Sequence, residues 1–363
     1  MLASLGVGGA EKQVLALAGR MVERGHSVTL VTLLPQAREE WPTTLPVIRL
    51  NIRKNAFSLA AALGRAGRIL SELKPDIVHS HGFHANMIAR LVSSIAGRRA
   101  VVSTIHNVYE GGWHRMLAYR LSEGLCTHTT AVSQAVAEQF LRLRAIRAEK
   151  FTVVPNGIDL GEFTPDPSRR ASTRASLGAD DEFVWLAAGR ITAAKDYPDL
   201  LRAFTRILEV DPKACLRIAG QGSEKEETRL RTLAANLGLG RRMQFLGLRR
   251  DLPDLLDAAD GFVSSSAWEG MPLAIAEAMA MEKPVVATDV GGVRELVGDA
   301  GSLVPARNPE ALAETMLELM RKPEADRLAI GRAARLRIQI GFDIESRVEE
   351  WETLYTSLVS SAP

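Results

Sequence analysis

Short β-branched segments alternate with segments of helical periodicity along nearly the whole chain, and this alternation constrains the fold more than any other feature. The first half has predicted strands at residues 27–33, 76–80, 100–105, 127–131 and 151–154, with helices near 10–24, 57–73, 84–96, 112–124 and 133–144. The second half has predicted strands at 183–188, 215–219, 243–246, 261–265, 284–288 and 302–304, with helices near 197–210, 224–237, 272–281, 309–320 and 324–338. This alternation is typical of parallel sheets covered by helices on both faces, so it predicts an α/β protein.

At 363 residues the chain is too long for one hydrophobic core, because such cores stop growing near about 250–300 residues. We therefore predict two doubly wound, Rossmann-like domains, at residues 1–160 and 161–340, joined by segment 155–159 (PNGID) and a polar stretch after it. Residues 341–363 contain one apolar stripe at helical spacing, formed by Ile344, Val348, Trp351, Leu354, Tyr355 and Leu358. We expect this last helix to cross back to the first domain.

Composition excludes several protein classes. With 46% hydrophobic and 24% charged residues, the chain has the balance of a globular protein. It contains no run of about 20 uncharged apolar residues, as a spanning helix needs. Its two cysteines, Cys126 and Cys215, cannot form a disulfide framework. Together with the lack of a secretory leader, they favour the cytoplasm.

The chain opens on a glycine-rich loop, segment 5–11 (LGVGGAE), with only Met1, Leu2, Ala3 and Ser4 before it. A doubly wound domain normally places a buried strand before its first glycine loop. We therefore expect the opening strand to be largely missing, at a cost in stability.

Charge is distributed unevenly. Residues 1–165 contain 19 Lys and Arg against 12 Asp and Glu, which gives +7, whereas the remaining residues give −5. The excess is concentrated in residues 51–100, at Arg53, Lys54, Arg65, Arg68, Lys74, Arg90, Arg98 and Arg99. It indicates an anionic partner, either a membrane surface or a phosphorylated substrate, unless these are simply solvated helix faces.

Segment 264–280 (SSSAWEGMPLAIAEAMA) carries the strongest chemical signal. Pro272 suits a first helical position, which places Glu269, Gly270 and Met271 just before a helix N-terminus that can bind phosphate or sugar oxygens. Glu277 is the one charge within that small, apolar helix. A buried carboxylate is costly unless it is hydrogen-bonded. Ribose hydroxyls would satisfy it, as would a backbone amide or an arginine.

Two cations follow the predicted strand 183–188. Gly189 allows a turn, and Arg190 and Lys195 then precede a helix. They suit a diphosphate leaving group that gains negative charge as it departs. Alternatively they are surface charges, with Asp196 as the partner of Lys195.

The glycine loops and the histidines are weaker signals. Gly8 and Gly9 would permit close backbone approach to a substrate, and segment 220–222 (GQG) is similar. His79 and His81 follow one strand and His106 another. A metal site normally needs a third ligand or carboxylates, and no such motif is evident. We favour a structural role for His79 and substrate contact for His106.

The chain resembles the family-four glycosyltransferases, or glycosyl transferase group 1. The motifs that carry this resemblance are the early GGAE, the PNGID segment, Gly189-Arg190 with Lys195, and Glu269-x7-Glu277 followed by segment 291–295 (GGVRE). The resemblance covers essentially the whole chain. It implies the GT-B fold, in which two Rossmann-like domains face a cleft. It also implies transfer of a hexosyl or N-acetylhexosaminyl unit from a nucleotide-diphosphate sugar, UDP being the commonest nucleotide, with retention of configuration.

The resemblance also implies residue roles. Glu277 would hold the donor ribose and Glu269 the transferred sugar, while Arg190 and Lys195 would clamp the diphosphate and His106 would contact the sugar. The other donor-binding residues implied are Gly9, Arg250, Ser266, Gly270, Met271, Pro272 and Leu273. In retaining members the leaving phosphate oxygen is thought to take the acceptor proton, so neither a nucleophile nor a metal or other cofactor is expected. The chain departs from the family at 281–283 (MEK), where a small residue and a glycine usually end the helix.

The resemblance implies a glycan or polyprenyl-diphosphate-linked acceptor and no nucleic-acid partner. Segment 113–121 (WHRMLAYRL) and the basic excess suit contact with an anionic membrane, at the inner face of the plasma membrane, although a core helix with a solvated edge has the same pattern. Two other functions fit a nucleotide-sugar site: a GT-B-fold epimerase that acts on the donor itself, and a non-catalytic sugar-nucleotide binding protein.

Overall fold

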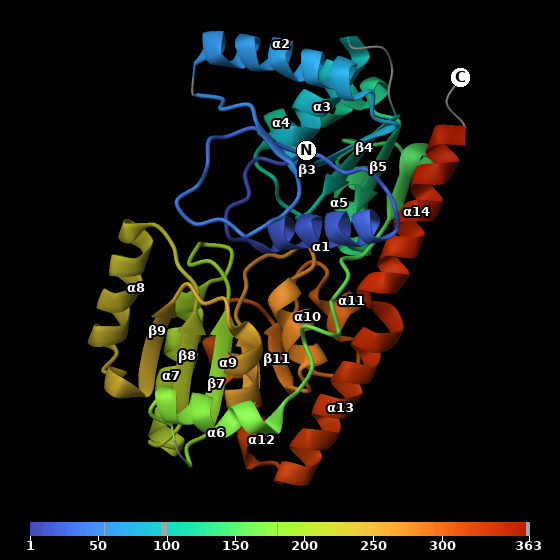
Figure 1. The fold of residues 1–363 in the computed structure, drawn as a ribbon. Coiled ribbons are helices and arrows are strands. Elements are labelled where there is room, and N and C mark those ends of the chain that lie inside the picture. The colour runs from blue at the N-terminus through green and yellow to red at the C-terminus, as the bar shows by residue number, and fades with distance from the viewer. Residues whose placement is uncertain (54, 96–99, 180, 361–363) are drawn as a thin grey trace. The chain divides into compact units, whose positions relative to one another are not determined.

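The computed structural model describes residues 1–53, 55–95, 100–179 and 181–360. The chain divides into two compact units (Figure 1). Unit 1 comprises Met1–Gly157 together with Ile344–Pro363, and unit 2 comprises Ile158–Asp343. The divide therefore follows Gly157, within the predicted joint at 155–159. Of the basic residues counted above, Lys54, Arg98 and Arg99 lie outside the described residues.

Unit 1 is built on parallel strands. Its strands are β1 (Leu30–Thr32), β2 (Val47–Arg49), β3 (Ile77–His81), β4 (Ala100–Ile105), β5 (His128–Ala131) and β6 (Phe151–Val153). Its α-helices are α1 (Gly9–Glu23), α2 (Ala56–Leu73), α3 (Phe83–Ile95), α4 (Trp113–Ser122), α5 (Gln134–Arg142) and α14 (Ile344–Ser360). Short 3-10 turns occupy Glu123–Leu125 and Ala148–Lys150. The strands form a β1–β2 pair and a sheet of order β3-β4-β5-β6.

The first residues of the chain join these two sheets. Leu2 pairs in parallel with Thr32 of β1, and the Leu33 amide donates to the Leu2 carbonyl at 3.1 Å. On the other side, the His81 amide donates to the Met1 carbonyl at 2.9 Å. Residues before the glycine loop therefore occupy the position of the opening strand that we expected to be largely missing.

Helices cover both faces of the unit 1 sheets. On β4, Val101 packs with α2 and α3, whereas the next residue, Val102, packs with α1 and α14, because successive strand residues point to opposite faces. All six apolar residues of the predicted C-terminal stripe belong to the core that α14 shares with α1. Ion pairs Arg20–Glu345 (2.7 Å) and Arg24–Glu352 (2.7 Å) flank it. The expected return of the last helix to the first domain is confirmed.

Unit 2 contains one sheet of order β12-β11-β10-β7-β8-β9, and each strand pair is parallel. Its strands are β7 (Val184–Ala188), β8 (Cys215–Ala219), β9 (Met243–Gly247), β10 (Gly261–Ser264), β11 (Val285–Thr288) and β12 (Ser302–Val304). Its α-helices are α6 (Pro167–Ser176), α7 (Tyr197–Val210), α8 (Glu224–Asn236), α9 (Leu252–Ala258), α10 (Leu273–Ala280), α11 (Val293–Val297), α12 (Pro309–Arg321) and α13 (Glu324–Gly341), with a 3-10 turn at Gly240–Arg242.

The main core of unit 2 lies between the sheet and α7, α8 and α12. Trp185 of β7 and Phe204 of α7 are both fully buried in it. Helix α10 contacts β10 and β11 and also packs against α13. Every predicted strand is present, whereas β2, α6, α9 and α11 were not predicted.

Candidate functional site

The sheet of unit 2 reverses its winding direction between β7 and β10. Strands β8 and β9 follow β7 on one side, whereas β10, β11 and β12 lie on the other side. In open parallel sheets, ligands bind at the carboxyl ends of the strands at such a switch point. The two predicted site segments, 189–195 and 264–273, leave the sheet from these neighbouring strands.

Lys195 and Glu269 form an ion pair at this point. Lys195 Nζ lies 2.6 Å from Glu269 Oε1, and the side chains are only 19% and 11% exposed. Ser266 Oγ donates to the same carboxylate oxygen at 2.7 Å. The sequence offered Asp196 as an alternative partner of Lys195, but Lys195 pairs with Glu269. Asp196 lies at the N-cap of α7, with a left-handed backbone (φ 42°). Three residues that the sequence identified in two separate motifs therefore meet.

Hydrogen bonds tie the two loops together. The Ala267 amide donates to the Ala194 carbonyl at 2.8 Å, and Ser265 Oγ donates to the Lys195 carbonyl at 2.9 Å. Thr288 Oγ1, at the end of β11, donates to the carbonyl of the fully buried Ser266 at 2.6 Å. The ion pair is thus held by backbone that is itself fixed, which favours a preorganised site.

Glycines make this close packing possible. Gly189 has φ 146°, and a Cβ there would lie 2.7 Å from Lys195 Cε. Gly291 has φ 51°, and a Cβ there would lie 1.8 Å from the carbonyl oxygen of Glu269. The Gly292 amide donates to the Gly270 carbonyl at 3.0 Å. The 291–295 segment of the family pattern therefore supports the Glu269 loop.

Gly291→Ala tests this support. We expect the free energy of unfolding to fall by more than about 2 kcal/mol, because strain of left-handed backbone adds to a clash with fixed backbone. Gly238 is a matched control, since it has φ 66° but nothing within 4 Å of an added Cβ. Urea unfolding of both variants measures the difference. An equal loss in the two variants would show that the contact with Glu269 is unimportant.

Helix α10 places Glu277 in apolar surroundings. Glu277 is 5% exposed, and its neighbours Ala276 and Ala278 are fully buried. Met271 and Leu273 are buried as well. Pro272 was predicted as the first helical residue, but it lies at the N-cap, where it provides no side-chain hydrogen bond. The helix therefore begins one residue later than predicted, at Leu273.

The two arginines predicted for the donor site, Arg190 and Arg250, are exposed. Within the described part of the chain, Arg190 forms no hydrogen bond or ion pair. Its guanidinium group is thus available to a ligand on the surface beside Gly189. Arg250 lies after β9, next to Arg249, which pairs with Asp251.

The end of α10 departs from the usual glycine cap, as the sequence predicted. Glu282 itself adopts the left-handed conformation, with φ 57°. The Lys283 amide donates to the Ala278 carbonyl at 2.9 Å, and the Glu282 amide to the Met279 carbonyl at 3.1 Å. The turn is therefore formed without glycine, at a cost of about 1–2 kcal/mol in backbone strain.

In unit 1 the three predicted histidines form a row. The rings of His79 and His81 lie 4.0 Å apart, and His81 Nδ1 is 3.0 Å from His106 Nε2. His79 lies between the hydroxyls of Tyr355 and Thr104, each at 2.6 Å. Burial lowers the pKa of His106 to about 4, so this imidazole is neutral near pH 7. These contacts fit the structural role expected for His79.

Within residues 1–53, 55–95, 100–179 and 181–360, no group of three or more His, Cys, Asp or Glu is placed to hold a metal ion. In the same described residues, no helix has the length and apolar character needed to cross a membrane.

A tryptophan side chain holds the early glycine loop by a hydrogen bond to its backbone. Gly9 is the first residue of α1, and Trp41 Nε1 donates to the Gly8 carbonyl at 3.2 Å. The weaker glycine segment 220–222 has a packing role, because a Cβ at Gly220 would lie 1.9 Å from the Gly189 carbonyl oxygen.

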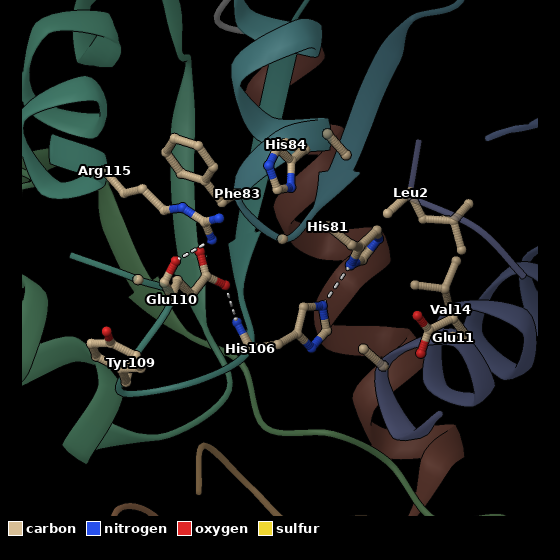
Figure 2. A pocket seen from close by; sticks show the side chains of 15 residues that line it. Leu2, Glu11, Val14, His81, Phe83, His84, His106, Tyr109, Glu110 and Arg115 are labelled. Carbon is tan, nitrogen blue, oxygen red and sulfur yellow. Dashed lines mark hydrogen bonds between the residues drawn. The ribbon is translucent and has the colours of Figure 1, made fainter. Parts of the chain in front are cut away.

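A pocket of about 440 Å³ in unit 1 contains a residue that sequence reasoning missed (Figure 2). The pocket is lined by the first residues of the chain, by α1 and by the loops after β3 and β4, and His106 and Glu110 both line it. Tyr119 Oη donates to Glu110 Oε2 at 2.6 Å. The signal that could have found Glu110 is the segment 110–112 (EGG), which follows a predicted strand as the other site loops do.

Two family models match the sequence, one in each unit. The family model "Glycosyl transferases group 1" matches residues 169–337, and the model "Glycosyltransferase Family 4" matches residues 7–162. Together these matches include Gly8 and Gly9 of the first glycine loop, segment 220–222, Glu269 and Glu277.

Curated relatives cover most of the chain. UDP-Gal:alpha-D-GlcNAc-diphosphoundecaprenol alpha-1,3-galactosyltransferase of Escherichia coli is 27% identical, over 80% of this chain and 78% of its own length. D-inositol 3-phosphate glycosyltransferase 1 of Catenulispora acidiphila is 27% identical, over 97% of this chain and 91% of its own length.

Solved structures share the fold. Anabaena Alr3699/HepE in complex with UDP has a TM-score of 0.83 and 25% identity, with 98% of each chain covered. WaaG, a glycosyltransferase involved in lipopolysaccharide biosynthesis, has a TM-score of 0.78 and 19% identity, again with 98% of each chain covered. These likenesses confirm the predicted two-domain fold.

Proposed function

Since the chain belongs to the family-four, group 1 glycosyltransferases of the GT-B fold, we propose that it transfers a hexosyl or N-acetylhexosaminyl unit from a UDP-sugar to a glycan or polyprenyl-diphosphate-linked saccharide. UDP is favoured because HepE was solved with UDP and the Escherichia coli relative is named for UDP-Gal. The lipid-linked acceptor follows the name of that same relative.

The Lys195–Glu269 pair carries this proposal. The pair lies at the switch point of the sheet, and the loop that carries Glu269 leads into α10, the helix that contains the buried Glu277. In our proposal the Glu277 carboxylate accepts hydrogen bonds from the ribose hydroxyls, and Glu269 binds the sugar. Backbone amides of 270–273 add donors for sugar or phosphate oxygens.

The proposed chemistry uses fixed cations in place of a metal. As the bond between the sugar C1 and the diphosphate oxygen breaks, charge accumulates on the diphosphate. Lys195, paired with Glu269, and the exposed guanidinium of Arg190 stabilise that charge. We propose no metal cofactor and retention of configuration, both of which rest on the family resemblance. The roles of His106, Gly9 and Arg250 toward the donor likewise rest on that resemblance.

A ligand screen followed by product analysis tests the proposal. UDP-, GDP- and ADP-sugars are added in a thermal-shift assay, in which specific binding raises the melting temperature. We expect a shift with a UDP-sugar. Incubation of UDP-galactose with α-D-GlcNAc-diphosphoundecaprenol in EDTA then gives a glycosylated product, whose anomeric configuration NMR determines. If the donor were epimerised when no acceptor is present, the protein would be an epimerase. If it bound the donor but turned over no acceptor, it would be a sugar-nucleotide binding protein.

We also propose that helix α4 contacts an anionic membrane. Trp113, Leu117 and Leu121 lie at helical spacing on α4 and are 78%, 43% and 76% exposed, while Tyr119 on the opposite side is fully buried. The exposed Arg120 lies beside this stripe, in a half of the chain with net charge +7. An apolar stripe with flanking cations suits the interface of an anionic bilayer.

Liposome flotation tests this contact. Protein bound to vesicles of phosphatidylglycerol and phosphatidylcholine at low salt is compared with a Trp113→Ser/Leu121→Ser variant, which we expect to lose most of its binding. Leu336→Ser is the control, because Leu336 is 55% exposed on α13 in unit 2. Absence of wild-type binding at low salt would remove the membrane proposal.

A further inference from the structure

Ser266 lies in the loop that joins β10 to α10, three residues before Glu269. The family resemblance implied that Ser266 contacts the donor directly. In the structure its side chain is fully buried, so a ligand at the surface of the site does not reach it. Any effect of the Ser266 hydroxyl on a donor therefore passes through a neighbouring residue.

A chain of hydroxyl groups ends on the Glu269 carboxylate. Ser266 Oγ lies 2.7 Å from Glu269 Oε1 and 3.2 Å from the Oγ of Ser264, the last residue of β10. A serine hydroxyl has one proton to donate, whereas the carboxylate of an ion pair only accepts. The Ser266 proton therefore goes to Glu269, and Ser264 donates in turn to Ser266. Hydrogen bonds in such a chain polarise and strengthen one another.

The protein uses only one oxygen of this carboxylate. Lys195 Nζ, at 2.6 Å, contacts the same Oε1 that accepts from Ser266. In the part of the chain that the structure describes, no group donates to Oε2. Glu269 is only 8% exposed, and a polar group in such surroundings is costly without a hydrogen-bond partner. Oε2 is therefore the oxygen that remains for a ligand.

The backbone on both sides of the Ser266 hydroxyl is fixed. Thr288 Oγ1, at the end of β11, donates to the Ser266 carbonyl at 2.6 Å. The amide of the next residue, Ala267, donates to the Ala194 carbonyl at 2.8 Å. Since the hydroxyl is attached to this backbone, it holds the Glu269 carboxylate in one orientation.

We propose that Ser266 is a positioning residue for the transferred sugar, a role that rests on the proposed glycosyltransferase function. Ser266 and Lys195 together hold Glu269 by Oε1, and Oε2 then accepts a hydrogen bond from a hydroxyl group of the sugar in the UDP-sugar. The last torsion of a glutamate side chain is soft. Without the Ser266 hydroxyl, the carboxylate turns more freely and either oxygen can pair with Lys195. The sugar then loses its oriented acceptor, whereas the UDP part keeps its contacts.

Support of the loop is the alternative role for this hydroxyl. A loop that is displaced disturbs Lys195 and the start of α10 together, so it weakens the binding of UDP as much as that of a UDP-sugar. A serine that only orients Glu269 leaves UDP binding intact and weakens the binding of the sugar. Comparison of the two ligands therefore separates the two roles.

The variants are chosen so that folding does not decide the result. Ser266→Ala removes the hydroxyl without adding volume to a buried site, so it avoids overpacking. Glu269→Ala removes the carboxylate through which Ser266 is proposed to act, and the double variant completes a cycle that measures their coupling. Ser176→Ala is the matched control, because Ser176 is an exposed serine of α6 whose hydroxyl donates to the Thr173 carbonyl at 2.7 Å.

Calorimetric titration of each protein with UDP, and with the UDP-sugar that the thermal-shift screen selects, tests the proposal; we expect that sugar to be UDP-galactose. Ser266→Ala is expected to bind UDP within about twofold of the wild type, and UDP-galactose about 5- to 20-fold more weakly. In the Glu269→Ala background, the same substitution is expected to change the affinity for UDP-galactose by less than about twofold. Ser176→Ala is expected to bind both ligands as the wild type does.

Three results would overturn the proposal. Equal losses for UDP and UDP-galactose in Ser266→Ala would make this serine a support of the loop. An unchanged affinity for UDP-galactose would show that the hydroxyl does not orient Glu269, and a loss that adds to that of Glu269→Ala would show that Ser266 acts by another route. Failure of the proposed function is distinct from all three, because the wild-type protein would then bind neither UDP nor a UDP-sugar.

Discussion

Replacing Lys195 with alanine is expected to lower kcat by about 100- to 1,000-fold, while the KM for the donor changes much less. A fixed cation at the departing diphosphate stabilises charge that develops in the transition state, and loss of one such group typically costs this much. The side chain is largely buried and is paired with Glu269, so its charge is in place before the donor binds. Steady-state kinetics with a UDP-sugar gives both constants.

Lys213→Ala is the control for this variant, because Lys213 is an exposed lysine on the loop before β8. It removes the same charge from the same unit at a distance from the ion pair. If Lys195→Ala raised only KM and left kcat unchanged, Lys195 would contribute equally to binding the donor and the transition state, contrary to our account.

Glu277→Ala is expected to weaken UDP binding by about 10- to 150-fold, because hydrogen bonds to a charged group contribute about 1.5–3 kcal/mol. The effect is assigned to Glu277 because this residue is 5% exposed within the apolar helix α10. Calorimetric titration with UDP measures the loss.

Glu314→Gln, at an exposed position on α12, is the control for Glu277→Ala. It is expected to bind UDP as the wild type does. Wild-type UDP affinity in Glu277→Ala would remove this residue from the donor site, and its buried carboxylate would then have a structural role.

The alternation of strands and helices was sufficient to predict the fold class, but not the elements that lack an apolar period. Helix α6 is the best example, because its sequence is too polar to resemble a core helix. It is fixed by ion pairs that form only in the folded unit, such as Arg169–Asp257 at 2.9 Å and Arg174–Asp260 at 3.0 Å. The partners are more than 80 residues apart, so local sequence does not reveal them.

Within the predicted site, the sequence identified residues but not their pairing. Lys195 and Glu269 were singled out separately, and their contact depends on the adjacency of β7 and β10. Glu110 was missed because nothing in its local sequence indicates that Tyr119 and Asn86 fix its position. Such tertiary contacts are what turn a list of polar residues into a chemical site.

The most direct measurement is a crystal structure of the protein with UDP bound. Our account predicts the ribose hydroxyls within hydrogen-bond distance of the Glu277 carboxylate, and the diphosphate beside Lys195 and the N-terminus of α10. UDP bound elsewhere, or a ribose that does not contact Glu277, would contradict the donor site described above.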